Sequence, residues 1–441
     1  EAYFTAVSEF KLDPDRFQSV KEKRLKDLKN SGLRPGRQAR SLLHQLLKKR
    51  ESSEGSKIAA LELLDHETLT NFVNQVWNSN AHVEGLIVGN VTADEALQMG
   101  SSIRNSLKNS APIAVDSFPK REIVNVPCGD ARFSLSTQNP EEGTNVVYVY
   151  YQHGPCTHNS RAVTLLVHQL IGEKLFDQLR TKEQLGYVAS GSLEQLYDVS
   201  GFRITVESAF HAPKFVEERI DAFLSGFPGQ IEEMEEEEFV KVRRSLVDSV
   251  LTMDVSLSAE ADRHWTHISN QKYQYYRGQI IAGLIDNVSK QEIVEWLKGN
   301  LVAVSASPAV RRVTIHVHGK NHPLEGGVDA STTTSSSLTE NDIPQLKQTW
   351  GFHPAEGDPT TVPALEMPPE AMAKLSNTDI SAALKKQDEM RKSALKKGSE
   401  HNISNQWAQR AADRRAMCAA GCACLKPTTA GGPFKMPRLK K

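Results

Sequence analysis

Apolar residues recur at helical spacing through the first part of the chain. Asp13 followed by Pro14 is a typical helix start, because the aspartate can cap free backbone N–H groups and proline suits the first turn. Apolar positions on one face then predict four amphipathic helices, which we expect to pack as a layer against a sheet. These helices are predicted over residues 13–30, around residues 42–47, from about residue 57 onward and over residues 69–77.

A short strand and a further helix are predicted next. Residues 83–88 form a compact apolar run, which is typical of a buried strand. Thr92 and Glu95 have the spacing of a capping box, in which both side chains bond backbone N–H groups at a helix start. Residues 109–120 contain two prolines and no periodicity, so we place a domain boundary there and expect a first unit over residues 1–117.

From residue 118 the pattern predicts strands mixed with helices. Residues 145–151 are dense in β-branched and aromatic side chains and are expected to form a central strand. The order of elements predicts an α+β sandwich, with an antiparallel-rich sheet covered by helices. Other strands are predicted at residues 122–126, 131–136, 188–191, 201–207 and 313–318, and helices at residues 160–179, 213–227, 232–250, 259–276 and 289–297.

The second unit is expected to end in a linker and a docked segment. Residues 331–337 are all Ser or Thr, which predicts a linker over residues 319–342. Residues 343–354 then offer enough apolar side chains to dock back on the unit. The second unit is therefore predicted to span residues 118–354.

The remaining residues, 355–441, are expected to be a mostly disordered tail, apart from a possible helix at residues 369–397. Three of the five cysteines, Cys418, Cys422 and Cys424, lie there, and their spacing lacks a fourth ligand for a zinc site. Free thiols are the simpler interpretation, with reversible acylation of a basic tail as the alternative. A sparse, odd cysteine count indicates a reducing compartment, and we expect a cytoplasmic protein.

Bulk composition excludes several classes of function. A chain of 441 residues is too long for one ordinary core. Its 53 Lys+Arg and 54 Asp+Glu give a net charge of -1, so no global field attracts nucleic acid or a membrane. The sequence has no apolar run of about 18 residues that would predict a membrane span. It begins at Glu1 without a signal-peptide pattern, and we expect a fragment of a longer protein.

The sharpest candidate chemistry lies in residues 175–191, where the long helix is expected to give way to a strand. Arg180, Lys182, Glu183 and Tyr187 gather at this joint. The Arg180 guanidinium is a planar donor suited to peptide carbonyls and carboxylates, and the Tyr187 hydroxyl can donate to an oxyanion. Alternatively, Arg180 satisfies helix-end carbonyls and Tyr187 packs on the sheet. On spacing alone the second interpretation is favoured.

Residues 179–187 resemble a signature of the C-terminal half of insulin-degrading-enzyme-like zinc metallopeptidases, the pitrilysin (inverzincin) family. The resemblance extends over about residues 10–354 and is specific, because flanking matches follow in the same order and spacing. These matches are Gly89-Asn90, residues 149–152, residues 257–260 with Trp265, and residues 343–354.

The resemblance implies a clamshell of four homologous α+β domains. In this family an H-x-x-E-H motif of the N-terminal half holds zinc, and the motif Glu is the base. By resemblance, Arg180 and Tyr187 are substrate-binding residues, residues 1–117 end the third domain, and residues 118–354 form the fourth. The implied partners are peptide substrates, the N-terminal zinc-bearing half of the same protein and a second copy in a homodimer; nucleic acid is not implied.

The zinc motif itself is absent from the sequence. None of the 14 histidines lies in an H-x-x-E-H frame. His66 and His168 lack the rest of the motif, and His316 and His318 share one face of a predicted strand with no helical carboxylate evident to complete a site. Each is more simply a solvated or core histidine. We expect zinc in the complete enzyme and no metal bound by this chain.

Two charged features have simpler explanations than binding sites. The acidic run at residues 232–238 suits the first turn of a helix better than a cation site. Many relatives carry a basic run before the residues that match 257–260, implicated in polyanion binding. Residues 251–256 contain no Lys or Arg here, so anion regulation through that site is not expected.

Together these features predict the C-terminal, non-zinc half of a zinc metalloendopeptidase that encloses and cleaves peptides, inactive on its own. The alternative is a catalytically inactive paralogue that acts as a peptide-binding or processing-complex subunit. A third interpretation is an adaptor whose tail carries a separate interaction. An H-x-x-E-H motif with a downstream Glu in any preceding sequence would favour the enzyme.

Overall fold

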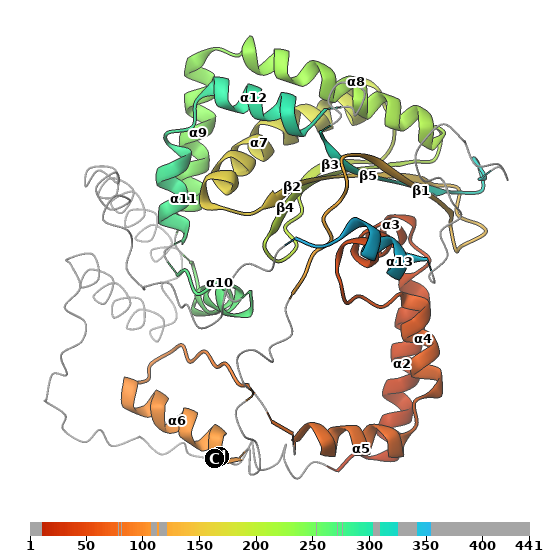
Figure 1. Ribbon diagram of the computed structural model, residues 1–441, viewed down its shortest axis with the longest axis vertical. Coiled ribbons are helices and arrows are strands. Elements are labelled where there is room, and N and C mark those ends of the chain that lie inside the picture. Colours follow the sequence, from red (N-terminus) through yellow and green to blue (C-terminus); the bar gives the residue numbers. More distant parts are fainter. Residues whose placement is uncertain are drawn as a thin grey trace, which may run out of the picture. The chain divides into compact units, whose positions relative to one another are not determined.

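A computed structural model shows one mixed sheet covered by helices, which confirms the predicted α+β fold class (Figure 1). Most of the predicted boundary at residues 109–120, most of the linker at residues 319–342 and the tail at residues 355–441, with its possible helix and its three cysteines, lie outside the described residues. The described residues are 11–77, 79–80, 82–106, 113, 121–252, 254–270, 272–275, 277–302, 309–324 and 342–353.

The sheet has five strands in the order β1-β5-β2-β4-β3. All neighbours pair antiparallel except β1 and β5, which are parallel. The predicted central position of β2 is confirmed, and its dense β-branched and aromatic sequence explains this place, because a central strand is buried on both faces. The strands are β1 (Gly129–Ser136), β2 (Asn145–Pro155), β3 (Val188–Leu193), β4 (Val199–Ser208) and β5 (Arg311–His318).

Alternate side chains of β2 enter two separate hydrophobic cores. Val147, Val149 and Tyr151 face the first core, which lies beneath a layer of helices. Tyr148 and Tyr150 face the second core on the opposite side of the sheet. The helices whose side chains build the first core are α7 (His158–Phe176), α8 (Pro213–Glu232), α9 (Glu236–Val250), α11 (Arg277–Ile285) and α12 (Lys290–Asn300).

The second core is closed by α3 (Pro35–Leu47) and α13 (Ile343–Trp350). Leu43, Leu46 and Leu47 of α3 are fully buried there. The predicted docking of residues 343–354 is confirmed, because Lys347 Nζ donates to the Lys48 carbonyl at 2.7 Å and residue 352 bridges residue 124. An early helix and a late helix thus share one core, while the division at residue 117 stays a prediction.

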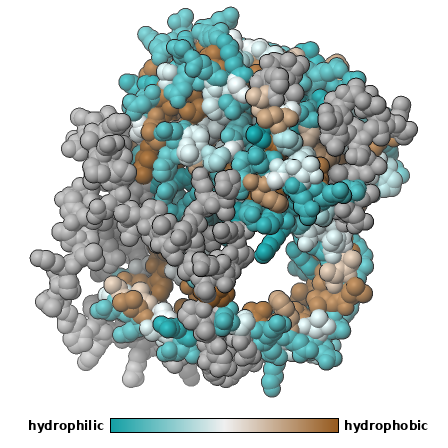
Figure 2. Space-filling view, viewed as in Figure 1, coloured by the Kyte–Doolittle hydropathy of each residue, from teal (hydrophilic) through white to brown (hydrophobic). Residues whose placement is uncertain are grey.

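The other early helices match their predicted positions but not the predicted layer. Asp13 caps its helix, accepting from Arg16 N at 2.7 Å, and Glu95 accepts from Thr92 N at 2.7 Å in the predicted capping box. However, α2 and α4 bury no side chain among the described residues, and hydrophobic surface is exposed along α2, α4 and α5 (Figure 2). These helices are α2 (Pro14–Ser31), α4 (Glu54–Leu63), α5 (His66–Trp77) and α6 (Ala93–Ser106).

Three element predictions were wrong or only partly right. Residues 83–88 do not form a strand, and Val83 is exposed; an apolar run needs a neighbouring strand for its backbone groups, and none pairs with it in the described part of the chain. Residues 122–126 contribute only isolated bridges instead of a strand. The helix predicted over residues 259–276 is α10 (Leu257–Ser269), and α11 begins separately at Arg277.

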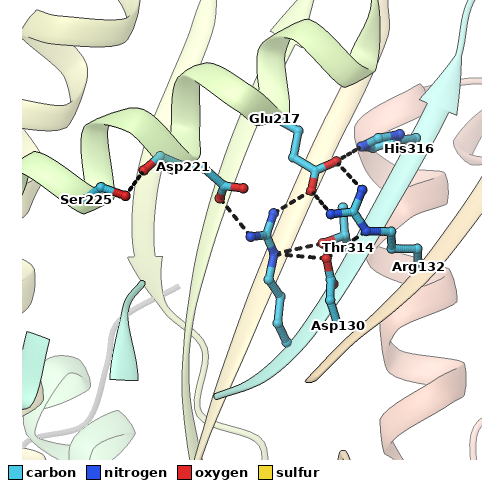
Figure 3. A network of polar contacts seen from close by, with 8 residues as sticks. Asp130, Arg132, Glu217, Asp221, Ser225, Thr314 and His316 are labelled. Atoms are coloured by element: carbon cyan, nitrogen blue, oxygen red, sulfur yellow. Dashed lines mark hydrogen bonds and ion pairs between the residues drawn. The ribbon is translucent and has the colours of Figure 1, made fainter. Parts of the chain in front are cut away.

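A buried ionic network fastens α8 to the sheet (Figure 3). Arg312 of β5, only 1% exposed, donates to Glu217 at 2.8 Å and to Asp221 at 2.7 Å, both on α8. Arg132 of β1 lies 2.7 Å from Glu217 and 2.8 Å from Asp130. Burial alone would raise the pKa of Glu217, but a hydrogen bond with His316 and the charges of the arginines lower it. Partner charges thus offset the cost of burying Arg312.

Candidate functional site

The joint, defined here as residues 177–187, begins where α7 changes its winding. Thr157 caps the start of α7, accepting from Ser160 N at 3.1 Å, and the helix is regular as far as Phe176. Asp177–Lys182 then form a π-helical turn, in which Glu183 N donates to the Gln178 carbonyl five residues back at 3.0 Å. Such widened turns are rare and are frequently found at functional sites.

Arg180, which is half-buried, and Tyr187, which is exposed, lie together at the end of this turn. Arg180 Nε donates to the Tyr187 carbonyl at 3.1 Å. The guanidinium lies over the rings of Phe176 and Tyr187, 4.8 Å and 5.3 Å from their centroids. The Tyr187 residue is 83% exposed, so it does not pack on the sheet as the alternative interpretation required. Within the described ranges no carboxylate forms an ion pair with Arg180, which leaves its charge available to a ligand.

The sequence Leu185-Gly186-Tyr187 sets the direction in which Tyr187 leaves the protein. Leu185 is buried in the first core. A Cβ on Gly186 would lie 1.8 Å from the Glu207 carbonyl of β4, so only glycine permits this close approach. Gln184 adopts a positive φ of 54°, which completes the sharp turn into β3.

Glu183 connects the joint to α8, because its carboxylate is already paired with Arg219 of that helix and is not free for a ligand. Its carboxylate accepts from Arg219 Nε at 2.7 Å and from Arg219 Nη2 at 3.0 Å, and Gln178 Nε2 donates to it at 2.7 Å. The hydrogen bonds from Arg219 lower the pKa of Glu183. Lys182 pairs with Asp177 at 2.8 Å on the surface. Of the four polar residues predicted at the joint, Arg180 and Tyr187 therefore remain as the candidates for binding.

An open depression of about 790 Å³ lies beside Arg180 and Tyr187. Phe210 and His211, from the loop between β4 and α8, also line it. Sequence reasoning missed both residues. The available signal was an aromatic side chain between the end of a strand and Pro213, the first residue of the next helix, where few core residues are expected.

The described residues do not fit a metal. Among them, no three His, Cys, Asp or Glu side chains converge to hold an ion. His316 and His318 lie side by side, their ring centroids 6.1 Å apart. The expectation that no helical carboxylate accompanies them was wrong: His316 Nε2 lies 3.0 Å from Glu217 of α8. The two residues are 99 positions apart in the sequence (316 − 217), so periodicity could not pair them.

The acidic run at residues 232–238 is divided between two helices. Glu236, Glu237 and Glu238 form the first turn of α9, as predicted for acidic residues at a helix start. Glu232 instead ends α8 and pairs with Lys298 at 2.6 Å. This arrangement gives the run a structural explanation.

Comparisons with known proteins agree with this architecture. Residues 166–265 match the family model described as "PQQ synthase PqqF-like, C-terminal lobe domain 4". The chain is 28% identical to a nardilysin-like protein of Arabidopsis thaliana over 345 residues, covering 77% of this chain and 33% of the relative. It is 29% identical to human nardilysin, covering 75% and 29%, and 28% identical to human insulin-degrading enzyme, covering 76% and 32%.

Solved structures show the same fold. The crystal structure of pitrilysin matches with a TM-score of 0.67 at 16% identity, covering 79% of this chain and 36% of that one. An inactive peptidase domain from Pseudomonas fluorescens matches with a TM-score of 0.51 at 13% identity, covering 72% and 74%. The chain spans about a third of the length of the curated relatives it matches. By sequence it is similar to the C-terminal part of insulin-degrading enzyme and nardilysin, and by fold to pitrilysin, so it resembles the C-terminal half of this group of peptidases.

Proposed function

We propose that this chain is the substrate-binding, non-zinc half of a zinc metalloendopeptidase that encloses and cleaves peptides. Residues 118–354 would form its fourth domain and residues 1–117 the end of its third. Zinc would be carried by the N-terminal half of the same protein. Peptides would be the substrates, and association into a homodimer and a cytoplasmic location remain expectations from the sequence.

The observation that carries the proposal is the pairing of the half-buried Arg180 with the exposed Tyr187 at the joint. Arg180 is oriented by its hydrogen bond to the Tyr187 carbonyl and by the two aromatic rings beside it. Such a group is ready to bind a peptide carbonyl or carboxylate without first losing side-chain freedom. The Tyr187 hydroxyl, exposed beside it, can donate to an oxygen on which charge develops during hydrolysis.

The alternative is a catalytically inactive paralogue that binds peptides or supports a processing complex. Both functions use the same residues, but they differ in whether a partner half supplies a zinc-bound nucleophile. If the chain is part of an active enzyme, peptides should be cleaved when the zinc-bearing half is present. If it is an inactive paralogue, peptides should bind without being cleaved.

Peptide binding by the chain itself tests the substrate-binding role. We expect Arg180→Ala to weaken binding of short peptides roughly tenfold, because a charge-assisted hydrogen bond contributes about 1.5 kcal/mol or more. Isothermal titration and NMR shift mapping would measure this. Lys182→Ala, in the same turn but paired with Asp177, is the matched control and should bind as wild type does. Equal affinity of Arg180→Ala and wild type would refute the assignment.

Zinc content and peptidase activity of the isolated chain test the division of labour. We expect no stoichiometric tight zinc and no cleavage, because catalysis is assigned to residues outside this chain. Elemental analysis after dialysis and a fluorogenic peptide assay would measure both. A chain that retained one zinc and cleaved peptides would overturn the proposal.

A further inference from the structure

Phe210 is an aromatic residue that is exposed to solvent beside Arg180 and Tyr187. The residue is 79% exposed and lines the same depression as those two residues. A phenylalanine left in water gives up the stabilisation that burial would provide. A ring of this size in an open depression that also holds oriented polar groups is typical of a binding site.

The loop that carries Phe210 is held on several sides. The Ser208 hydroxyl, in a residue that is 1% exposed, accepts from Phe210 N at 3.4 Å and from His211 N at 3.0 Å. Asn145 Nδ2 donates to the His211 carbonyl at 3.1 Å, and Asn321 Nδ2 donates to the Ala209 carbonyl at 3.1 Å. The position of Phe210 is therefore set by the end of the sheet and not by a free loop.

The residue after Asn321 and helix α8 also support this loop. His322 Nε2 lies 3.3 Å from the Phe210 carbonyl, and the His211 ring lies against Phe215 of α8, with centroids 5.1 Å apart. The backbone of Phe210 is thus tied down while its ring points away from the core. This combination presents the ring to a ligand at little cost in conformational freedom.

The charges around the depression define the ligand that fits it. Arg180 contributes a positive charge, whereas the negative charge of Glu183 is already paired with Arg219. The site therefore repels basic side chains and favours a carbonyl or carboxylate next to an apolar group. An aromatic or aliphatic side chain can stack on Phe210 while Arg180 holds the neighbouring backbone oxygen.

We propose that Phe210 is a specificity-determining residue that selects peptides with a large apolar side chain next to the backbone held by Arg180 and Tyr187. The inference rests on the proposed peptide-binding function and goes beyond it, because it assigns a side-chain preference to the loop between β4 and α8. It also predicts that Phe210 affects the choice between peptides more than binding in general.

The test is a set of paired peptides that differ in one central residue, either Phe, Ala or Lys, titrated against the 441-residue chain. Wild type should bind the Phe peptide about tenfold more tightly than the Ala peptide, and the Lys peptide no better than the Ala peptide. Phe210→Ala should abolish the Phe preference and leave Ala-peptide binding within about twofold of wild type. Phe210→Leu should retain part of the preference, since it keeps an apolar side chain.

Phe72→Ala removes another exposed phenylalanine ring, 59% exposed and located on α5 away from the depression, and is the matched control; it should leave the preference intact. Circular dichroism would confirm that each variant is folded. If the peptides bind and Arg180→Ala weakens them all, but Phe210→Ala keeps the Phe preference, the inference is wrong and the proposed function survives. If wild type binds none of the peptides, both fail.

Discussion

At the scale of single residues, Gly186 decides where Tyr187 points. The position that its Cβ would occupy is 1.8 Å from the Glu207 carbonyl, which is backbone of β4, paired on both sides within the sheet, and cannot rotate away. Leu185 anchors one side of this glycine in the core, and Tyr187 emerges on the other. The Leu-Gly-Tyr sequence is thus explained by packing and close approach as well as by function.

Gly186→Ala should therefore destabilise the protein by about 2–4 kcal/mol, because β3 must shift away from β4. It should also weaken peptide binding by displacing Tyr187. Urea unfolding and peptide titration would measure the two effects. Gly172→Ala, inside α7 with open space at its Cβ, is the control and should be neutral or stabilising by about 0.5–1 kcal/mol. If Gly186→Ala were as stable as wild type, residue 186 and β4 could move apart without loss of stability, and the prediction would be wrong.

Glu194 makes the stability of the folded protein depend on pH. This carboxylate lies 3.3 Å from His44 Nε2, 3.2 Å from Arg40 and 2.9 Å from Arg203, and so ties α3 to the sheet. Burial alone would raise its pKa, but the hydrogen bond with His44 and the charges of both arginines lower it from 4.5 to about 2. A lowered pKa in the folded state contributes stability that is complete above pH 4.5 and is lost as the pH falls towards 2.

Replacing this carboxylate should remove that acid sensitivity. We expect Glu194→Gln to cost about 2 kcal/mol at pH 7, allowing for solvent screening at the half-exposed Arg40, and almost nothing near pH 2. Unfolding free energies of both proteins across this range would measure the difference. Parallel curves for the two proteins would contradict the assigned pKa shift.

At the scale of elements, α8 links the ionic network to the joint. Arg312 pairs with Glu217 and Asp221 on one side of this helix, and Arg219 of the same helix holds Glu183 of the joint. Burial raises the pKa of Asp221 even though Arg312 opposes this change. The position of the joint therefore depends on α8, and α8 is held on the sheet by ion pairs as well as by hydrophobic packing.

Breaking this network from one side should be costly. Glu217→Ala leaves Arg312 and Arg132 with too few partners, and we expect a loss of about 3–5 kcal/mol in unfolding free energy. Lys298→Ala, which removes an exposed ion pair with Glu232, should change stability by less than about 1 kcal/mol. Chemical denaturation of both variants would show the contrast. Similar small losses in both would mean that the buried charges are hydrated.

The elements also show which parts of this structure a sequence can reveal. Strand β2 was predictable because a strand buried on both faces needs apolar residues throughout. Residues 83–88 have a similar pattern but no pairing strand in the described chain, and a local pattern cannot reveal that. Arg180 and Tyr187 came from the family resemblance, whereas Phe210 was missed because exposure depends on how distant segments meet.

At the scale of the whole molecule, the central claim is that this chain supplies substrate-binding residues to a zinc centre held elsewhere. Exposed apolar surface along the early helices fits a protein with further parts, and the relatives are about three times as long as the matched region. The enzyme and the inactive paralogue differ only at this scale, because the residues described here are compatible with both.

Peptide turnover by the longest polypeptide that contains this chain tests that claim most directly. In the presence of the zinc-bearing half, Arg180→Ala and Tyr187→Phe should each lower kcat/KM by roughly tenfold to a hundredfold, because a donor to the developing oxyanion is lost. Zinc content and thermal unfolding should stay at wild-type values. Undiminished turnover in both variants would contradict the account and return Arg180 and Tyr187 to a purely structural role.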